Sequence, residues 1–458
     1  MAANQRQSFG GLRARHDIAV ALLVCGAGCA PGPTSLRVTF SGQPLSEQGD
    51  LRFKVFATQD ERSCAELEAM VVPQPPIPDV EVIALREVPG NEWPRAIDLV
   101  PIRQGGRAFG VVLLSNVPHA TFCSEPGLSE VEAQVHLLRT RPGPTMHAQR
   151  ARFSAVPLGG GAVVVVGGSR AGQAVEVFDP QLDAFTLISP LILERRFGVA
   201  SALPDGRVLV SGGLAPSRTA ATARVEVVDP DGGPSTLVES METARELHAA
   251  TLLPNGSVLV TGGLSGSFAL SSAELYEPDA GTWRAVGELG AARFFHTATL
   301  LADGTVLIAG GADLAGSLSS TELYDPATQT FSPGPAMDSP RDRHVAVLLA
   351  DGSVLLAGGG GLNAERFVPA TRTLVPAGAL SVEDDNPCAT RLPSGQVALS
   401  GTSQVVQVFE PLTSGWSATA VLSVARQGCQ AWLAPAGGVL FAGGNANAHH
   451  ASTEIVEP

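Results

Sequence analysis

The sequence predicts an all-β protein whose main domain is a closed ring of seven four-stranded repeats. Three observations carry this prediction. One motif recurs seven times between Arg150 and the C-terminus, at intervals of about 41 to 50 residues. Turn-forming pairs that contain glycine fall at nearly the same offset in each copy, and stretches with helical periodicity are scarce.

Each copy opens on a residue that is arginine in six of the seven cases. These opening residues are Arg150, Arg195, Arg245, Arg293, Arg341, Asp385 and Arg426. In the clearest copy an apolar strand leads to the turn Asp303-Gly304, which is typical of a tight β-hairpin. The second strand then ends in the pair Gly310-Gly311, where the lack of side chains permits close backbone approach.

The second half of each copy predicts two more strands. The third strand begins with an acidic residue and ends in proline, as in Glu322 to Pro326. Proline lacks the N–H that a ladder needs and therefore ends the strand. The fourth strand often carries an aromatic residue, such as Trp283, Phe331 or Trp416.

The glycine pair, the following glutamate and the aromatic residue of the fourth strand resemble the kelch repeat over residues 150–458. This resemblance implies a seven-bladed kelch-type β-propeller in residues 129–458. The last copy stops at Pro458, after its third strand. We expect residues 131–138 to supply the missing fourth strand, because this closure removes the open sheet edges.

The N-terminal region predicts export. In residues 1–29, basic residues precede the short apolar run Ile18 to Val24, and small residues precede Cys29. The segment ending at Cys29 resembles a bacterial lipoprotein processing site, as in exported kelch-repeat lipoproteins. This resemblance implies a lipid on Cys29 and an anchored position in the outer membrane or at the cell surface. Ordinary secretion, periplasmic retention and a lack of export are the alternatives.

Residues 30–128 contain short strand-like runs separated by polar turns, which predicts a small immunoglobulin-like β-sandwich. The chain has an even set of four cysteines beyond its first 29 residues. Cys64 and Cys123 fall in the sandwich, whereas Cys388 and Cys429 each follow an opening residue by three positions in adjacent copies. We predict both pairs to be disulfides, with free buried thiols as the alternative.

His248, His296 and His344 occupy one equivalent position in copies three to five, which places them close to the channel. Three imidazoles are a ligand set for zinc or copper. Propeller symmetry spreads equivalent residues apart, so we interpret these histidines as structural and predict no metal and no cofactor. The repeated arginines and glutamates are interpreted as structural hydrogen bonds from blade to blade.

Composition and motifs restrict the function. A net charge of −14 argues against nucleic-acid binding. The fold resembles that of galactose oxidase, whose copper centre uses tyrosines, histidines and a cysteine. The only two tyrosines, Tyr276 and Tyr324, lie in the repeated turn, so the sequence argues against that copper activity. No nucleophile elbow or phosphate-binding loop is present.

These observations favour a monomeric, non-catalytic envelope protein that binds a protein partner. The variable loops between the second and third strands of each blade are the expected recognition surface. The alternative is a carbohydrate-binding or carbohydrate-active propeller. Exposed aromatic residues, or a carboxylate, a histidine and an arginine that converge at the channel mouth, would favour this alternative. The tryptophans are accounted for elsewhere in the fold, which leaves few platforms for a glycan.

Overall fold

A computed structural model describes nine strands between Gln7 and Val135, and residues 139–457 except 215–219 and 446–448. The described residues contain strands and two short 3-10 helices, Gly159–Gly161 and Pro435–Gly437. None of them forms a helix long and apolar enough to cross a membrane.

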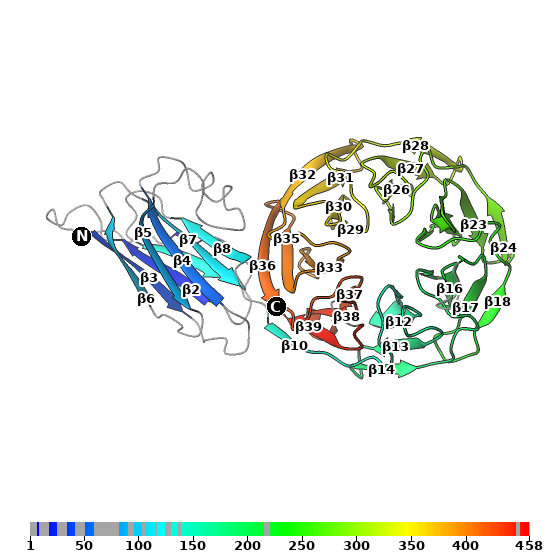
Figure 1. Cartoon of the computed structure of the whole chain (residues 1–458), viewed down its shortest axis with the longest axis horizontal. Coiled ribbons are helices and arrows are strands. Elements are labelled where there is room, and N and C mark those ends of the chain that lie inside the picture. The colour runs from blue at the N-terminus through cyan, green and yellow to red at the C-terminus, as the bar shows by residue number, and fades with distance from the viewer. Residues whose placement is uncertain are drawn as a thin grey trace.

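The seven repeats form seven four-stranded antiparallel sheets, or blades, arranged as a closed ring (Figure 1). This confirms the prediction of an all-β seven-bladed propeller. In each of the first six blades the strands follow one another in sequence order from the channel outward. Each second strand is fully apolar or nearly so and fully buried, because it packs between neighbouring sheets.

Blades one to three are bounded as follows. Blade one contains β11 (Ser154–Pro157), β12 (Val163–Val166), β13 (Val175–Asp179) and β14 (Ala184–Leu187). Blade two contains β15 (Val199–Ala202), β16 (Val208–Ser211), β17 (Val225–Val228) and β18 (Thr236–Val238). Blade three contains β19 (Ala249–Leu252), β20 (Val258–Thr261), β23 (Ala273–Glu277) and β24 (Thr282–Ala285), with a small hairpin of β21 (Leu264–Ser265) and β22 (Phe268–Ala269).

Blades four to six follow the same plan. Blade four contains β25 (Thr297–Leu300), β26 (Val306–Ala309), β27 (Thr321–Asp325) and β28 (Thr330–Pro333). Blade five contains β29 (Val345–Leu348), β30 (Val354–Ala357), β31 (Asn363–Val368) and β32 (Thr373–Ala379). Blade six contains β33 (Cys388–Arg391), β34 (Val397–Ser400), β35 (Val405–Glu410) and β36 (Gly415–Val421).

Blade seven joins both ends of the propeller domain. Its strands are β37 (Gln430–Leu433), β38 (Val439–Ala442), β39 (Thr453–Glu457) and β10 (Arg139–Pro142). β10 pairs antiparallel with β39, and the Arg141 side chain lies 2.6 Å from a carboxylate oxygen of Glu457. An N-terminal strand therefore closes the ring, but it lies immediately after the predicted segment 131–138. The residues around 131–135 instead form β9 (Glu130–Val135), which pairs with β2 (Ile18–Val24).

The N-terminal strands form two further sheets. The first has the order β1 (Gln7–Ser8), β9, β2, β3 (Thr34–Ser41) and β6 (Ala96–Ile102). The second has the order β5 (Val82–Pro89), β4 (Leu51–Thr58), β7 (Arg107–Leu114) and β8 (Val117–Cys123). The immunoglobulin-like assignment stays a prediction. So does the Cys64–Cys123 disulfide, because Cys64 lies outside the described residues.

A buried arginine–glutamate pair organises six of the seven blades. In blade four, Arg293 donates to Glu322 (2.7 Å), to the carbonyl of Gly310 (2.7 Å) and to the carbonyl of Ser320 (3.1 Å). Glu322 also accepts the N–H of Gly290, 2.7 Å away, from the segment that enters the blade. The equivalent pairs are Arg150–Glu176, Arg195–Glu226, Arg245–Glu274, Arg341–Glu365 and Arg426–Glu454. The pairs are structural, as predicted, but both partners belong to the same blade.

Neighbouring blades are joined instead through the glycine pairs. The Gly168 N–H of blade one donates to the carbonyl of Arg195 in blade two, 2.8 Å away. Gly167 has a left-handed φ of 62°, and a Cβ there would lie 2.5 Å from the same carbonyl oxygen. Only glycine fits this contact, which explains why the pair recurs.

Blade six departs from the pattern. Asp384, not the predicted Asp385, occupies the place of the opening arginine, and the amide of Gln407 donates to it at 3.0 Å. Gln407 also accepts the N–H groups of Ser381 and Val382, as glutamate does in other blades. Burial is the main cause that raises the pKa of Asp384, from 3.8 to about 6.

We expect Arg293→Met to lower the free energy of unfolding by about 3–5 kcal/mol, because it leaves the Glu322 carboxylate buried without its cation. The matched control is Arg207→Met, which breaks an exposed pair with Asp205 and should cost about 0–1 kcal/mol. Urea unfolding followed by intrinsic fluorescence measures both. Equal losses in the two variants would show that the buried pair has no special role.

Asp384 predicts a distinct pH dependence. The pKa is raised in the folded state, so the folded protein holds more protons than the unfolded chain between pH 3.8 and about 6. The contribution of Asp384 to stability should therefore fall as pH rises through this window, by up to about 3 kcal/mol relative to Asp384→Asn. Unfolding midpoints of both proteins at pH 4 to 7.5 test this. A difference that does not change with pH would contradict it.

Candidate functional site

The mouth of the channel is built from one residue of each blade, two positions after the opening residue. These seven residues, the mouth ring, all have left-handed φ values of 52° to 68°. They are Arg152, Phe197, Leu247, Phe295, Arg343, Asn386 and Gly428. The buried opening residue holds the backbone at the start of each blade in one position. The residue two positions later therefore lies at the channel in every blade.

Backbone hydrogen bonds run around the mouth ring. The N–H of Phe295 donates to the carbonyl of Leu247, and the N–H of Arg343 donates to that of Phe295, both at 3.0 Å. The N–H of Gly428 donates to Asn386 at 2.9 Å. The series continues from Arg152 to Gly428 (3.1 Å), from Phe197 to Arg152 (3.4 Å) and from Leu247 to Phe197 (3.2 Å). Among the described residues, only the junction between Arg343 and Asn386 lacks this bond.

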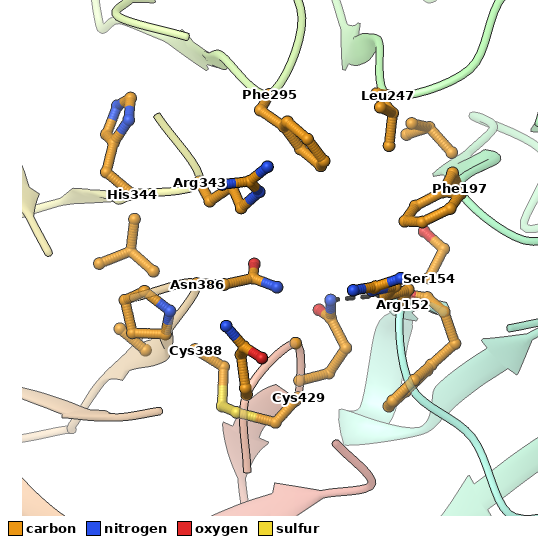
Figure 2. A pocket seen from close by; sticks show the side chains of 18 of the residues that line it. Arg152, Ser154, Phe197, Leu247, Phe295, Arg343, His344, Asn386, Cys388 and Cys429 are labelled. Carbon is orange, nitrogen blue, oxygen red and sulfur yellow. Dashed lines mark hydrogen bonds between the residues drawn. A yellow bond between two sulfur atoms is a disulfide. The ribbon is translucent and has the colours of Figure 1, made fainter. Parts of the chain in front are cut away.

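The mouth ring opens into a cavity of about 670 Å³ (Figure 2). One side of the cavity is apolar and is formed by Phe197, Leu247 and Phe295 of blades two to four. The rings of Phe197 and Phe295 meet edge to face, with centroids 6.5 Å apart. All three side chains are only partly buried, so the cavity has an accessible apolar arc.

The other side is polar. Arg343, Asn386, Gly428 and Arg152 form this polar arc, and Figure 2 shows the Arg343 and Asn386 side chains pointing into the cavity. Arg343 lies 4.2 Å from the centre of the Phe295 ring, and Arg152 lies 5.2 Å from that of Phe197.

Asp385 adds a carboxylate to the lining, next to the polar arc. It is exposed, and its Oδ2 accepts a hydrogen bond of 3.2 Å from the amide of Gln427. The cavity thus combines an aromatic wall with guanidinium, amide and carboxylate groups.

The three predicted channel histidines line the wall behind the mouth ring and are buried. Nε2 of His248 lies 2.9 Å from the hydroxyl of Ser211 in the preceding blade. His296 makes the equivalent contact with Thr261 at 2.9 Å, whereas His344 contacts Thr297 on the first strand of blade four, also at 2.9 Å. Each histidine therefore links its own blade to the preceding one.

Burial keeps these histidines neutral at physiological pH. It lowers the pKa of His248 and of His344 to about 3, with a further contribution from nearby arginines. The pKa of His296 is also far below its ordinary value, again mainly through burial. The histidines therefore add no positive charge to the cavity.

Cys388 and Cys429 form a disulfide beneath the polar arc, with Cα atoms 5.5 Å apart (Figure 2). The predicted pairing is therefore present, but the two positions are not equivalent. Cys388 is the first residue of β33, whereas Pro387 occupies the place that the histidines hold in blades three to five. The bond joins Cys388, at the start of β33 in blade six, to Cys429, the residue before β37 in blade seven, and both cysteines line the cavity.

The aromatic platforms of this site were not among the residues predicted from the sequence. Of the tryptophans, Trp283 and Trp416 pack against Tyr276 and Phe409 in the outer part of their blades. The platforms are Phe197 and Phe295. A signal was present, because the opening arginine recurs while the residue two positions later changes from blade to blade.

Comparison with known proteins identifies the fold and not the activity. No protein-family model matches the chain, and no curated protein matches it. Among solved structures, the chain is similar to a fungal alcohol oxidase of the AA5 family in complex with copper. The identity is 18%, the TM-score is 0.56, and the match covers 70% of this chain and 76% of the oxidase. In all, 694 solved chains match, so the fold is too widespread to fix a reaction.

This similarity contradicts the expectation of a non-catalytic scaffold that is not an enzyme, because the fold is shared with a catalyst. It also makes the cavity, and not the loops, the candidate functional site. The loops between second and third strands begin beside the mouth ring, as the bridge between Glu246 and Leu264 shows. The described lining of the cavity contains no residue of these loops, so the loops begin next to the mouth ring but do not line the cavity.

The residues present do not fit a copper centre. Tyr276 and Tyr324 lie on third strands, buried in the hydrophobic clusters between blades. Both cysteines at the cavity are joined in the disulfide. Within the part of the chain that the structure describes, no three His, Cys, Asp or Glu side chains are grouped as metal ligands. The shared fold therefore does not carry over the copper chemistry.

Proposed function

We propose that this protein is a carbohydrate-active propeller that takes a saccharide into the cavity at the channel mouth. The observation that carries this proposal is the division of the mouth ring into an apolar arc and a polar arc. A saccharide has the same division, with a face of C–H groups and an edge of hydroxyl groups. Concave sites with apolar walls and a few fixed polar groups are the usual form of small-ligand sites.

The two arcs act on different parts of the sugar. Phe197 and Phe295 offer apolar ring surface to the C–H face, and their arrangement is held by the edge-to-face contact between them. Asn386 and Gln427 offer amide donors and acceptors to the hydroxyl groups. The mouth ring is fixed by backbone hydrogen bonds, so little conformational entropy is lost on binding.

Asp385 is the residue to which we assign proton transfer. It is the only carboxylate that lines the described part of the cavity, and the amide of Gln427 orients it. Hydrolysis by a pair of carboxylates about 5–10 Å apart would need a second acidic group, and the described lining contains none. The lining therefore favours acid–base chemistry at a single carboxylate.

The finer family assignment and the location form part of this proposal. The repeat resembles that of kelch proteins, and the first 29 residues resemble the leader of a bacterial lipoprotein. On this proposal the protein is anchored through Cys29 in the cell envelope, and the cell envelope contains saccharides. The disulfide between Cys388 and Cys429 is consistent with an oxidising compartment.

The carbohydrate proposal predicts saturation-transfer NMR signals between the chain and a member of a panel of hexoses, sugar alcohols, uronates and oligosaccharides. Phe295→Ala should weaken this binding about tenfold, because it removes half of the aromatic wall. Phe268→Ala, on the exposed hairpin outside the cavity, is the matched control and should bind normally.

The same protein tests the chemical step. Asp385→Asn should keep the binding and lose turnover, measured by product NMR on the bound sugar, with peroxide release followed with and without added copper. Failure of every saccharide to bind, or binding unchanged in Phe295→Ala, would contradict the proposed function. Turnover that requires copper would contradict the argument from the metal ligands.

The location proposal predicts that palmitate labels the protein in a bacterial host and that Cys29→Ser abolishes the label. The mature chain should begin at Cys29, and removal of the leader would take β1 and β2 out of the N-terminal sheet. Mass spectrometry of the N-terminal peptide measures both results. An unlabelled protein that retains Met1 would exclude the anchor.

A further inference from the structure

We infer that the saccharide is acidic and that its carboxylate binds at the polar arc, between Arg343 and Asn386 on one side and Arg152 on the other. The inference rests on the proposed function and narrows it to a substrate class, the uronic acids and other carboxylated sugars. Three features of the described residues support it.

The first feature is the break in the mouth ring. Six junctions carry a backbone hydrogen bond, whereas the described residues Arg343 and Asn386 make none with each other. Asn386 has a left-handed φ of 52°, like the other ring members, but its N–H donates to no carbonyl among the described residues. The Asn386 N–H therefore remains a donor at the edge of the cavity, where its side-chain amide adds a second one (Figure 2).

The second feature is the charge of the lining. The chain as a whole carries −14, yet the ionised groups of the described lining are Arg152, Arg343 and Asp385. The three histidines are neutral because burial lowers their pKa values. The lining therefore holds two guanidinium groups against one carboxylate, and Asp342 contacts Arg343 from outside the lining. Two guanidinium groups at one site favour an anionic ligand over a cationic one.

The third feature is the availability of the two guanidinium groups. Arg343 contacts the neighbouring Asp342 at 2.9 Å, but 37% of its side chain stays exposed. Arg152 is exposed and, within the described part of the chain, has no carboxylate within ion-pair distance. Each guanidinium stacks on a phenylalanine, which holds its plane in place. A planar guanidinium with parallel donors is suited to a carboxylate.

Gly428 accommodates the side chains of Asn386 and Arg152, which lie against it on either side in the ring. A Cβ there would be 3.0 Å from Nδ2 of Asn386 and 3.5 Å from Cγ of Arg152. A side chain at this position would therefore crowd both polar groups, and glycine lets them keep their present positions. The apolar arc on the opposite side then receives the C–H face of the same sugar.

The test compares acidic and neutral forms of one sugar on the full chain with its disulfide intact. Galacturonate, galactose and the methyl ester of galacturonate, with the matching glucose series, are measured by calorimetry at low and at physiological salt. We expect the acid to bind at least about tenfold more tightly than the neutral forms, with a preference that falls as salt rises. Arg152→Met combined with Arg343→Met should abolish the preference and leave the weak neutral binding in place.

Two further variants test whether the preference for the acid depends on the polar arc. Gly428→Ala should reduce the preference for the acid without affecting the aromatic wall. Arg372→Met, an exposed arginine in the turn between β31 and β32, should leave the preference unchanged. Circular dichroism confirms that each variant is folded.

The outcomes separate the two proposals. Equal binding of acid, ester and neutral sugar would overturn the inference while the carbohydrate proposal stands. An acid preference that survives the double arginine variant would also overturn it. Failure of all six sugars to bind, together with the rest of the saccharide panel, would remove both proposals.

Discussion

The buried arginine–glutamate pair is the interaction on which the rest of the propeller depends. A charge pair enclosed in a blade is stable only when its other hydrogen-bonding groups are satisfied. In blade four, the carbonyls of Gly310, Ser320 and Ala291 and the N–H of Gly290 fulfil this condition. In three other blades the Nε of the arginine has no partner among the described residues; these arginines are Arg150, Arg245 and Arg341. The pair therefore fixes the position of the second and third strands and of the segment before the first strand. Blade six keeps a similar bonding pattern with Asp384 and Gln407 in place of the arginine and the glutamate.

This constraint also explains how a symmetric fold obtains an asymmetric site. Each opening residue presents the residue two positions later at the channel, and nothing in the pair restricts what that residue is. The residue at the mouth can therefore differ from blade to blade while the buried pair stays the same. In this chain three neighbouring blades contribute apolar side chains, and the other four contribute arginine, asparagine and glycine. The disulfide and the break between Arg343 and Asn386 lie on the polar side, where the repeat is least regular.

The sequence predicted the parts of the molecule that repeat. A turn in seven copies, with a glycine pair and a glutamate in six of them, predicts the strands and the number of blades. Two cysteines near the channel in neighbouring copies predicted the disulfide. The predicted position of the closing strand was wrong. Residues 131–135 have the alternating pattern of a strand, but they form β9 of the N-terminal sheet. The actual closing strand, Arg139–Pro142, is too short to show such a pattern. The candidate site was not predicted because its residues do not repeat. Phe197, Phe295, Arg152 and Arg343 belong to no recurring motif, and only the closed ring of blades brings them together.

The central claim is that chemistry in this protein takes place at the mouth ring and not on the loops around it. A crystal structure of the full chain soaked with a uronic acid tests it most directly. The account predicts the sugar ring against Phe197 and Phe295, with its carboxylate between Arg343 and Arg152. A sugar bound at the exposed tip near Phe268, with an empty cavity, would contradict it.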